Sequence, residues 1–327
     1  MNEIKSQGVD CKVVKDQFIP LFSKNFLLYF KTKNNSKKLI ESYNPNFIIV
    51  DGVATYATNA IKKNIPFFMY LRGNIWEERK SLLPKLSRHP HRKLSYLYQW
   101  KIFDKCLEKS TKILSVSHYL DEIIKKNLPE KKTDVLYPGL DSSKWFCQSD
   151  LKLKHPNIGI IQRAINWEKS KELLILTKIL KSFPKVHFYW IGDGPHSKRI
   201  LTNLEKYENF EWLGKKPHPE YVRKFLSEID IYALFSGYDT LGISTIEAEL
   251  MKKPVIISNV GGTPETIVEN ETGFLIKIGD YNDWIKKINL LLANQDLRKI
   301  MGQKGYDFAK QNFNLKKTAN ELISLCK

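Results

Sequence analysis

Short apolar runs alternate with longer amphipathic stretches along most of the chain. Turn-forming residues bound each run, as is typical of strands buried on both faces of a parallel sheet. The stretches between the runs, such as Glu172–Lys181 and Trp284–Ala293, carry apolar residues at helical spacing. This alternation predicts an α/β fold. The predicted strands are Phe47–Val50, Phe67–Tyr70, Ile113–Val116, Val135–Tyr137, Ile158–Gln162, Val186–Ile191, Phe210–Leu213, Ile231–Phe235, Val255–Ser258 and Phe274–Ile276.

A break in the pattern follows the fourth predicted strand. Tyr137–Asp141 contains a Pro-Gly pair that ends the strand, and the polar, lysine-rich segment Ser149–Pro156 comes soon after. The 327 residues suffice for about two domains of roughly 150 residues each. We therefore predict an N-terminal domain over residues 1–147 and a C-terminal domain that begins at residue 148.

Charge leaves three interpretations open. The net charge is +18, which suits nucleic acid, an anionic membrane face, or simply lysine-rich solvated surfaces. The lysines are spread along the chain and no nucleic-acid motif accompanies them. No apolar run approaches the ~18 residues of a membrane helix. The four cysteines form no C-x-x-C pair, which argues against a zinc site or a disulfide framework.

The segment Ser236–Gly273 carries the most chemistry. Gly242 lies near the start of the predicted helix Leu241–Lys252, and the turn Gly261–Gly262 precedes a second predicted helix start at Thr263–Pro264. A helix N-terminus offers free N–H groups and the positive end of a dipole, which suits a phosphate.

Two acids flank the first of these helix starts. Asp239 precedes the helix and Glu247 lies inside it, eight positions later. Carboxylates accept hydrogen bonds from sugar hydroxyls. A site for phosphate and hydroxyls together is what a sugar nucleotide requires. Glu249, close by on the same helix, is interpreted as an exposed helix acid.

Three more loops follow predicted strands. Arg163 and Lys169 bracket the first loop, where both cations can reach one diphosphate at the carboxyl end of a parallel strand. The alternative interpretation is that they are two solvated charges with no ligand. Gly192–Pro195 and Leu213–Lys215 follow the next two strands. Alone, each of these two is a weak signal, and a tight turn explains the first equally well.

Together these motifs resemble the retaining glycosyltransferases of the family 4 type, which have the GT-B architecture. The resemblance runs from about Leu39 to the C-terminus and is strongest over Asn157–Ile276. Departures are Asp239 in place of Glu, Gln162 in place of a small residue, and Ser170 in place of Gly. The resemblance implies two Rossmann-like domains with parallel sheets facing across a cleft. It also implies a C-terminal domain over 148–311 and a last helix, within 312–327, that crosses back to the N-terminal domain.

The resemblance also implies roles for individual residues. Asp239, Arg163 and Lys169 would be catalytic. The donor-binding residues would be Gly192, Gly214, Leu241, Gly242, Ile243, Glu247, Gly261 and Gly262. The acceptor-side residues would be Arg72, Gly73, Asn74 and Ser117. Arg72 stands where many relatives have His, and its pKa above ~12 prevents it from acting as a general base.

The expected function is transfer of a sugar from a nucleoside diphosphate sugar, such as a UDP-sugar or GDP-sugar, to a glycan, lipid-linked or other cell-envelope acceptor. We expect no cofactor and no metal, since the sequence contains no Asp-x-Asp. We expect a cytoplasmic protein, with peripheral attachment to the inner membrane face as one option. The alternatives are a sugar-nucleotide epimerase of the same architecture, a binding-only relative, and a basic nucleic-acid-binding protein.

The beginning of the chain carries one further expectation. Met1–Gln7 resembles the end of the first helix of these enzymes, Gly8 its C-cap, and Cys11–Val14 the second strand. On this alignment the usual opening strand and its glycine-rich loop would be absent, which predicts weak transfer with intact nucleotide binding.

Overall fold

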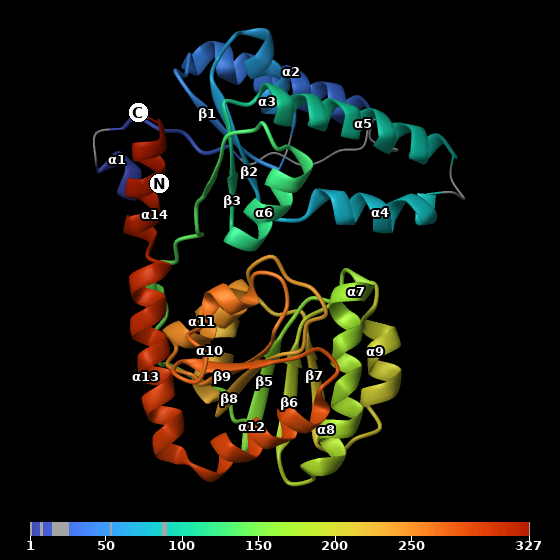
Figure 1. Cartoon of the computed structure of the whole chain (residues 1–327), viewed down its shortest axis with the longest axis vertical. Coiled ribbons are helices and arrows are strands. Elements are labelled where there is room, and N and C mark those ends of the chain that lie inside the picture. The colour runs from blue at the N-terminus through green and yellow to red at the C-terminus, as the bar shows by residue number, and fades with distance from the viewer. Residues whose placement is uncertain (1, 7–8, 15–25, 53, 87–89, 327) are drawn as a thin grey trace. The chain divides into compact units, whose positions relative to one another are not determined.

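The computed structural model describes residues 2–6, 9–14, 26–52, 54–86 and 90–326 (Figure 1). The chain forms two compact units. One comprises Met1–Tyr137 with Thr318–Lys327, and the other Pro138–Lys317. The units therefore divide after Tyr137 rather than after residue 147. All ten predicted strands are confirmed, with ends shifted by at most two residues.

The first unit contains a four-stranded parallel sheet in the order β1-β2-β3-β4. Its strands are β1 (Ile48–Asp51), β2 (Phe67–Leu71), β3 (Lys112–Ser115) and β4 (Thr133–Val135). The helices before and between them are α1 (Asn2–Lys5), α2 (Phe26–Tyr43), α3 (Ala54–Lys62), α4 (Ile75–Leu86), α5 (Pro90–Lys109) and α6 (His118–Asn127).

The last helix, α14 (Leu315–Cys326), belongs mainly to this first unit. Leu322 and Leu325 pack against a small buried cluster that includes Phe68 of β2 and Leu114 of β3. The hydroxyl of Thr318 donates to the carbonyl of Tyr137, 3.0 Å away. The chain thus returns to its N-terminal unit from Thr318 onward.

The second unit contains a six-stranded parallel sheet in the order β10-β9-β8-β5-β6-β7. Its strands are β5 (Asn157–Ile161), β6 (His187–Ile191), β7 (Phe210–Gly214), β8 (Ile231–Leu234), β9 (Val255–Ser258) and β10 (Gly273–Ile276). Its helices are η1 (Ser142–Lys144), α7 (Trp167–Ser170), η2 (Lys171–Ile175), α8 (Leu176–Ser182), α9 (Ser197–Leu204), α10 (Glu220–Glu228), α11 (Ile243–Leu250), η3 (Thr263–Thr266), α12 (Tyr281–Ala293) and α13 (Gln295–Asn312).

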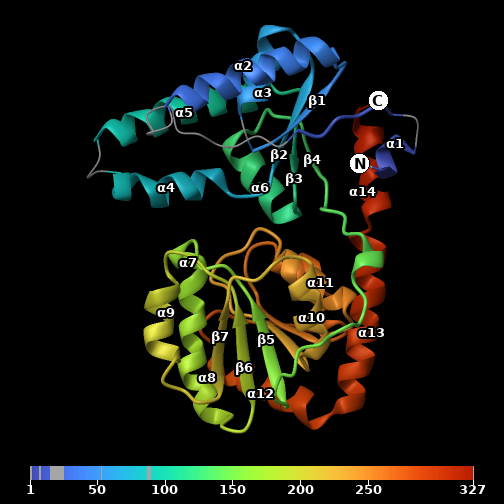
Figure 2. The same ribbon diagram turned by 180° about the vertical axis from the view of Figure 1, so that it is seen from behind.

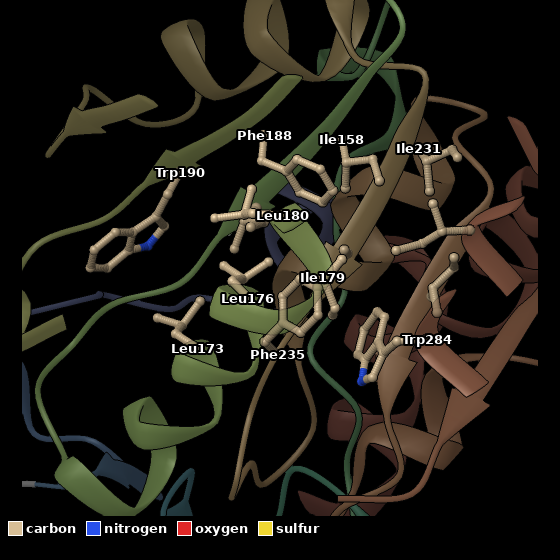
Figure 3. Packing of buried hydrophobic residues seen from close by; sticks show 14 of the residues in the cluster. Ile158, Leu173, Leu176, Ile179, Leu180, Phe188, Trp190, Ile231, Phe235 and Trp284 are labelled. Atoms are coloured by element: carbon tan, nitrogen blue, oxygen red, sulfur yellow. The ribbon is translucent and has the colours of Figure 1, made fainter. Parts of the chain in front are cut away.

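The core of the second unit lies between this sheet and the helices η2, α8 and α12 (Figure 3). Leu173, Leu176 and Leu180 contribute from the helical side and are buried completely or almost so. The rings of Phe235 and Trp284 stack with centroids 4.0 Å apart, just beyond the carboxyl end of β8. This packing fixes the sheet edge from which the site residues extend.

Two predicted elements are wrong and one is modified. The predicted strand Cys11–Val14 is irregular and joins no strand of the sheet. Helix α1 covers part of the predicted helix Met1–Gln7. Gln7 and Gly8 lie outside the described residues. Thr263–Pro264 begins only the four-residue 3-10 turn η3. The predicted helix Glu172–Lys181 begins in 3-10 form as η2 and continues as α8.

Candidate functional site

The order of the strands places a topological switch point beside β5. This strand pairs with β6 on one side and with β8 on the other, so the loops after β5 and β8 leave the sheet in different directions. Open parallel sheets bind ligands at the carboxyl ends of their strands, in the crevice between such loops. Arg163 and Lys169 follow β5, and Asp239 follows β8, so the structure brings these predicted residues to one edge of the sheet.

An ion pair joins the two loops at the switch point. Nζ of Lys169 lies 2.6 Å from Oδ2 of Asp239, and both side chains are mostly buried. The other carboxylate oxygen of Asp239 accepts from the backbone N–H of Thr240 at 2.9 Å. Asp239 is therefore held in one orientation by a cation of α7, which follows β5, and by an amide from its own loop.

Both departures from the family pattern near Lys169 make hydrogen bonds. Nε2 of Gln162 donates to the carbonyl oxygen of Lys169 at 3.3 Å, and Gly237 N–H donates to the same oxygen at 2.9 Å. Ser170 is fully buried, and its hydroxyl donates to Asn166 O at 2.7 Å. A Cβ on Gly237 would lie 2.2 Å from the carbonyl oxygen of Glu168, so this close approach requires glycine.

Arg163 differs from Lys169 in its surroundings. Its side chain is exposed, and no other described residue pairs with its guanidinium. A fork of five donors is thus available to an anion at the end of β5.

Helix α11 begins beside the ion pair with its first amides unused. Gly242 is its N-cap in the left-handed region, with φ of 90°, and supplies no capping side chain. No described residue accepts a hydrogen bond from the N–H groups of Gly242, Ile243 and Ser244. Ser244 Oγ donates to Ile161 O at 3.2 Å, which ties this helix end to β5. The arrangement leaves donors and a helix dipole open to an anion.

The turn at Gly261 and Gly262 packs directly on the loop of Asp239. The N–H of Gly262 donates to Asp239 O at 3.1 Å, and a Cβ on Gly262 would lie 2.1 Å from Thr240 O. Gly261 is in the left-handed region, with φ of 56°. The two glycines therefore fix the conformation of the loop that carries Asp239. The short turn η3, which follows them, does not provide the second helix N-terminus that was expected to bind phosphate.

Glu247 has a partner that sequence reasoning missed. Nε2 of His218, in the loop after β7, lies 2.7 Å from Glu247 Oε1. Oε2 has no hydrogen-bond partner among the described residues and is available to a ligand hydroxyl. The His218 ring lies 6.0 Å from that of Trp145. The hydrogen bond to Glu247 raises the pKa of His218, with a smaller contribution from the charge of Glu220. The pair is 29 residues apart, so no local spacing could have signalled it.

We expect the His218–Glu247 pair to stabilise the fold more in acid than in alkali. The folded-state pKa of His218 is raised, so its contribution is complete below the unfolded value of about 6.5 and disappears as the pH rises through the folded value. Urea unfolding of wild type and His218→Gln should show a stability difference that is larger at pH 5.5 than at pH 8.5. Glu247→Gln should reduce this pH dependence more than Glu220→Gln. An equal stability difference between wild type and His218→Gln at both pH values would contradict this prediction.

Gly192 and Gly214 have structural roles in this sheet edge. A Cβ on Gly192 would lie 1.8 Å from the carbonyl oxygen of Gln162. Gly192 N–H donates to Gly214 O at 3.0 Å, and Nε1 of Trp212 donates to Gly192 O at 2.8 Å. The ends of β5, β6 and β7 are thereby joined. Contact of either glycine with a donor stays a prediction.

The predicted acceptor-side residues lie in the first unit, after β2 and β3. Arg72 pairs with Asp51 at 3.4 Å, and both are half-exposed. Asn74 is buried and its Oδ1 accepts from Glu77 N–H at 3.1 Å, near the start of α4. Gly73 lies between them. Ser117 is buried and caps α6 by accepting from Leu120 N–H at 3.1 Å. Asn74 and Ser117 thus position helices, and contact with an acceptor stays a prediction.

The interpretation of Glu249 is wrong. Its side chain is fully buried, and burial raises its pKa well above the ordinary value, an effect that the Thr272 hydroxyl opposes in part. The side chain lies 3.2 Å from where a Cβ on Gly305 of α13 would be, so it is enclosed between two helices.

Comparison with known proteins agrees with this geometry. The chain is 29% identical over 204 residues to an uncharacterized glycosyltransferase of Methanocaldococcus jannaschii, covering 62% of this chain and 55% of that protein. It resembles the structure of a sucrose-phosphate synthase from Thermosynechococcus elongatus, with a TM-score of 0.75 and 19% identity over 94% of this chain and 79% of that one. It also resembles Anabaena HepE in complex with UDP, with a TM-score of 0.69 and 15% identity over 90% of this chain and 82% of that one.

These likenesses and the two parallel sheets show that the fold is GT-B. The chain spans somewhat more than half the length of the first curated relative. A sequence model described as Glycosyl transferases group 1 matches residues 141–308. Since this match covers more than half of the chain, including Arg163, Lys169, Asp239 and Glu247, the chain belongs to the glycosyl transferases group 1 family.

Proposed function

We propose that this protein transfers a sugar from a nucleoside diphosphate sugar to a glycan, lipid-linked or other cell-envelope acceptor, with retention of the anomeric configuration. The Lys169–Asp239 ion pair across the switch point, beside the open N-terminus of α11, is the observation that carries the proposal. It places a cation, a carboxylate and free amides at one sheet edge. A sugar diphosphate needs all three.

The donor diphosphate would be held by positive groups from two loops. Arg163 offers a planar fork, Lys169 a point charge, and the amides at Gly242 and Ile243 the helix dipole. These groups would stabilise the negative charge that develops as the diphosphate departs. Because the ion pair and the hydrogen bonds to Lys169 O fix the loop before any ligand arrives, little reorganisation would be needed.

The two carboxylates would have separate duties. Asp239 would contact the transferred sugar, with Lys169 fixing its orientation. Glu247 would accept hydrogen bonds from the ribose hydroxyls through Oε2, while His218 holds Oε1. Leu241, Gly261 and Gly262 would complete the wall around the donor.

The proposed reaction needs neither a metal ion nor a protein base. Arg163, Lys169 and the start of α11 would supply the positive charge that a divalent cation supplies elsewhere. Arg72 cannot accept a proton near neutral pH, so the leaving phosphate is the group proposed to take the acceptor proton. Arg72, Gly73, Asn74 and Ser117 would lie on the acceptor side.

The proposed setting is the cytoplasm, at the face of an anionic membrane. The net charge of +18 favours attraction to such a surface. None of the described helices has the length and apolar character needed to cross a bilayer.

We expect transfer to continue in excess EDTA and to give a product with the anomeric configuration of the donor. The purified chain would be incubated with UDP-, GDP- and ADP-sugars and candidate lipid-linked or glycan acceptors, and the products analysed by NMR. Activity that stops with EDTA and returns with Mg²⁺ or Mn²⁺ would contradict metal independence. Interconversion of the free donor would indicate an epimerase, and nucleotide binding without product a binding-only protein.

A further inference from the structure

The N-terminal half of helix α5 exposes apolar side chains and buries polar ones. Leu94, Leu97 and Tyr98 are 66%, 42% and 52% exposed, whereas Ser95 and Gln99 are buried. The spacing of the three apolar residues places them on one face of the helix. A surface helix normally turns its apolar stripe toward the core. Among the described residues, nothing pairs with the amide of buried Gln99, so this reversal also leaves a buried polar group unsatisfied.

Contacts elsewhere around α5 prevent the helix from rotating to hide these residues. Arg79 of α4 lies over the rings of Trp100 and Phe103, at 5.5 Å and 5.8 Å, and pairs with Asp104 at 2.7 Å. Cys106 and Leu107 are buried one turn further on. In both views α4 and α5 extend as a pair beyond the four strands of their unit (Figures 1 and 2). The apolar face is therefore held outward.

Cations outnumber acids along this apolar face. Lys93 and Lys101 are exposed beside it, and Pro90–Phe103 contains no acid. The first acid of the helix, Asp104, is neutralised by Arg79. A second copy of the same chain would bring a like-charged surface and a net charge of +18, which opposes self-association through this face. Apolar groups flanked by lysines are instead complementary to the headgroups and outer acyl region of an anionic lipid layer.

We propose that the α5 face, formed by Lys93, Leu94, Leu97, Tyr98 and Lys101, docks on an anionic lipid surface. The leucines and the tyrosine ring enter the interfacial region, where an aromatic body with a polar tip is favoured. The two lysines remain at the level of the lipid phosphates. The inference goes beyond the proposed function by naming the surface, and it depends on that function only for the purpose that docking serves.

Flotation of the full chain with vesicles tests this surface. Phosphatidylglycerol-containing vesicles should bind the protein at low salt, and pure phosphatidylcholine vesicles much less. Leu94→Ser/Leu97→Ser/Tyr98→Ser should reduce the partition coefficient at least tenfold, and Lys93→Glu/Lys101→Glu should remove the preference for anionic lipid. Lys299→Glu/Ile300→Ser on α13 is the matched control, because Ile300 is 56% exposed beside an exposed lysine. It should bind as wild type does.

Several results would overturn the proposal. They are no binding of the wild type to anionic vesicles, equal binding by the triple serine variant, or equal losses in the α13 control. A lipid-free dimer that the triple variant abolishes would assign the face to a second copy instead. Thermal shift with UDP, GDP and ADP, run on the same samples, separates this proposal from the proposed function. Vesicle binding without a nucleotide response would support the docking face and contradict the donor site. A nucleotide response without vesicle binding would support the donor site and contradict the docking face.

Discussion

Alanine in place of Arg163 or Lys169 is expected to weaken nucleoside diphosphate binding at least tenfold. Each cation would make charge-assisted hydrogen bonds worth ~1.5–3 kcal/mol. Transfer should fall further than affinity, because the same groups face the charge of the departing diphosphate. Titration calorimetry with UDP, GDP and ADP measures the affinity. The assignment is wrong if both variants bind as wild type does.

A matched control and a second readout sharpen this prediction. Lys171→Ala removes a neighbouring lysine that pairs with Glu168 on the exposed side, and it should leave nucleotide affinity unchanged. Lys169→Ala should also destabilise the fold by about 1–2 kcal/mol, since it leaves Asp239 without its cation; the pair is partly solvated, so the cost is below that of a fully buried pair. Arg163→Ala, which breaks no pair, should not.

Gly262→Ala is expected to cost about 3 kcal/mol or more of folding stability and to abolish nucleotide binding. The backbone of Gly262 is ordinary, with φ of −88°, so the cost is purely steric: the new Cβ would lie 2.1 Å from Thr240 O. Relief of that contact must move Thr240 and the adjoining Asp239. Urea unfolding and calorimetry measure the two effects.

Gly279→Ala separates steric exclusion from backbone strain. Gly279 has φ of 79° but nothing within 4 Å of its Cβ position. Its substitution should cost only about 1–2 kcal/mol, the penalty of the left-handed region, and leave nucleotide binding intact. If Gly262→Ala is no more damaging than this control, the turn yields easily and does not fix the loop of Asp239.

Most strands were predictable because they are buried on both faces and form apolar runs, as in β5, β8 and β9. The outer strands β1, β4 and β7 are only partly buried. Cys11–Val14 also contains apolar residues in a short segment, but it lies outside the sheet. At Thr263–Pro264 the proline favours a helix start, but the Thr263 hydroxyl donates back to Ser258 O and Val260 O and closes a compact turn. Ile267 then resumes extended backbone, which limits the helix to one turn.

The site was predictable as a set of strand ends, and its pairings were not. Parallel topology brings Arg163, Lys169 and Asp239 to one edge, but only the loop conformation shows that Lys169 bonds Asp239. His218 escaped notice because its partner is distant in sequence. Glu249 was misjudged because small residues of α13, Gly302 and Gly305, let that helix approach α11 closely; a Cβ on Gly302 would lie 2.1 Å from Lys252 O.

The return of the chain to its first unit at Thr318 has a consequence for synthesis on the ribosome. Pro138–Lys317 is one continuous stretch and can complete its sheet as soon as it has emerged. The unit that emerges first must wait for Leu322 and Leu325 to cover Phe68 and Leu114. Domains usually mature in the order of translation. Here the order is reversed for the final step, because a chain that lacks the segment from Thr318 onward holds the whole C-terminal unit but an N-terminal unit that still exposes apolar surface.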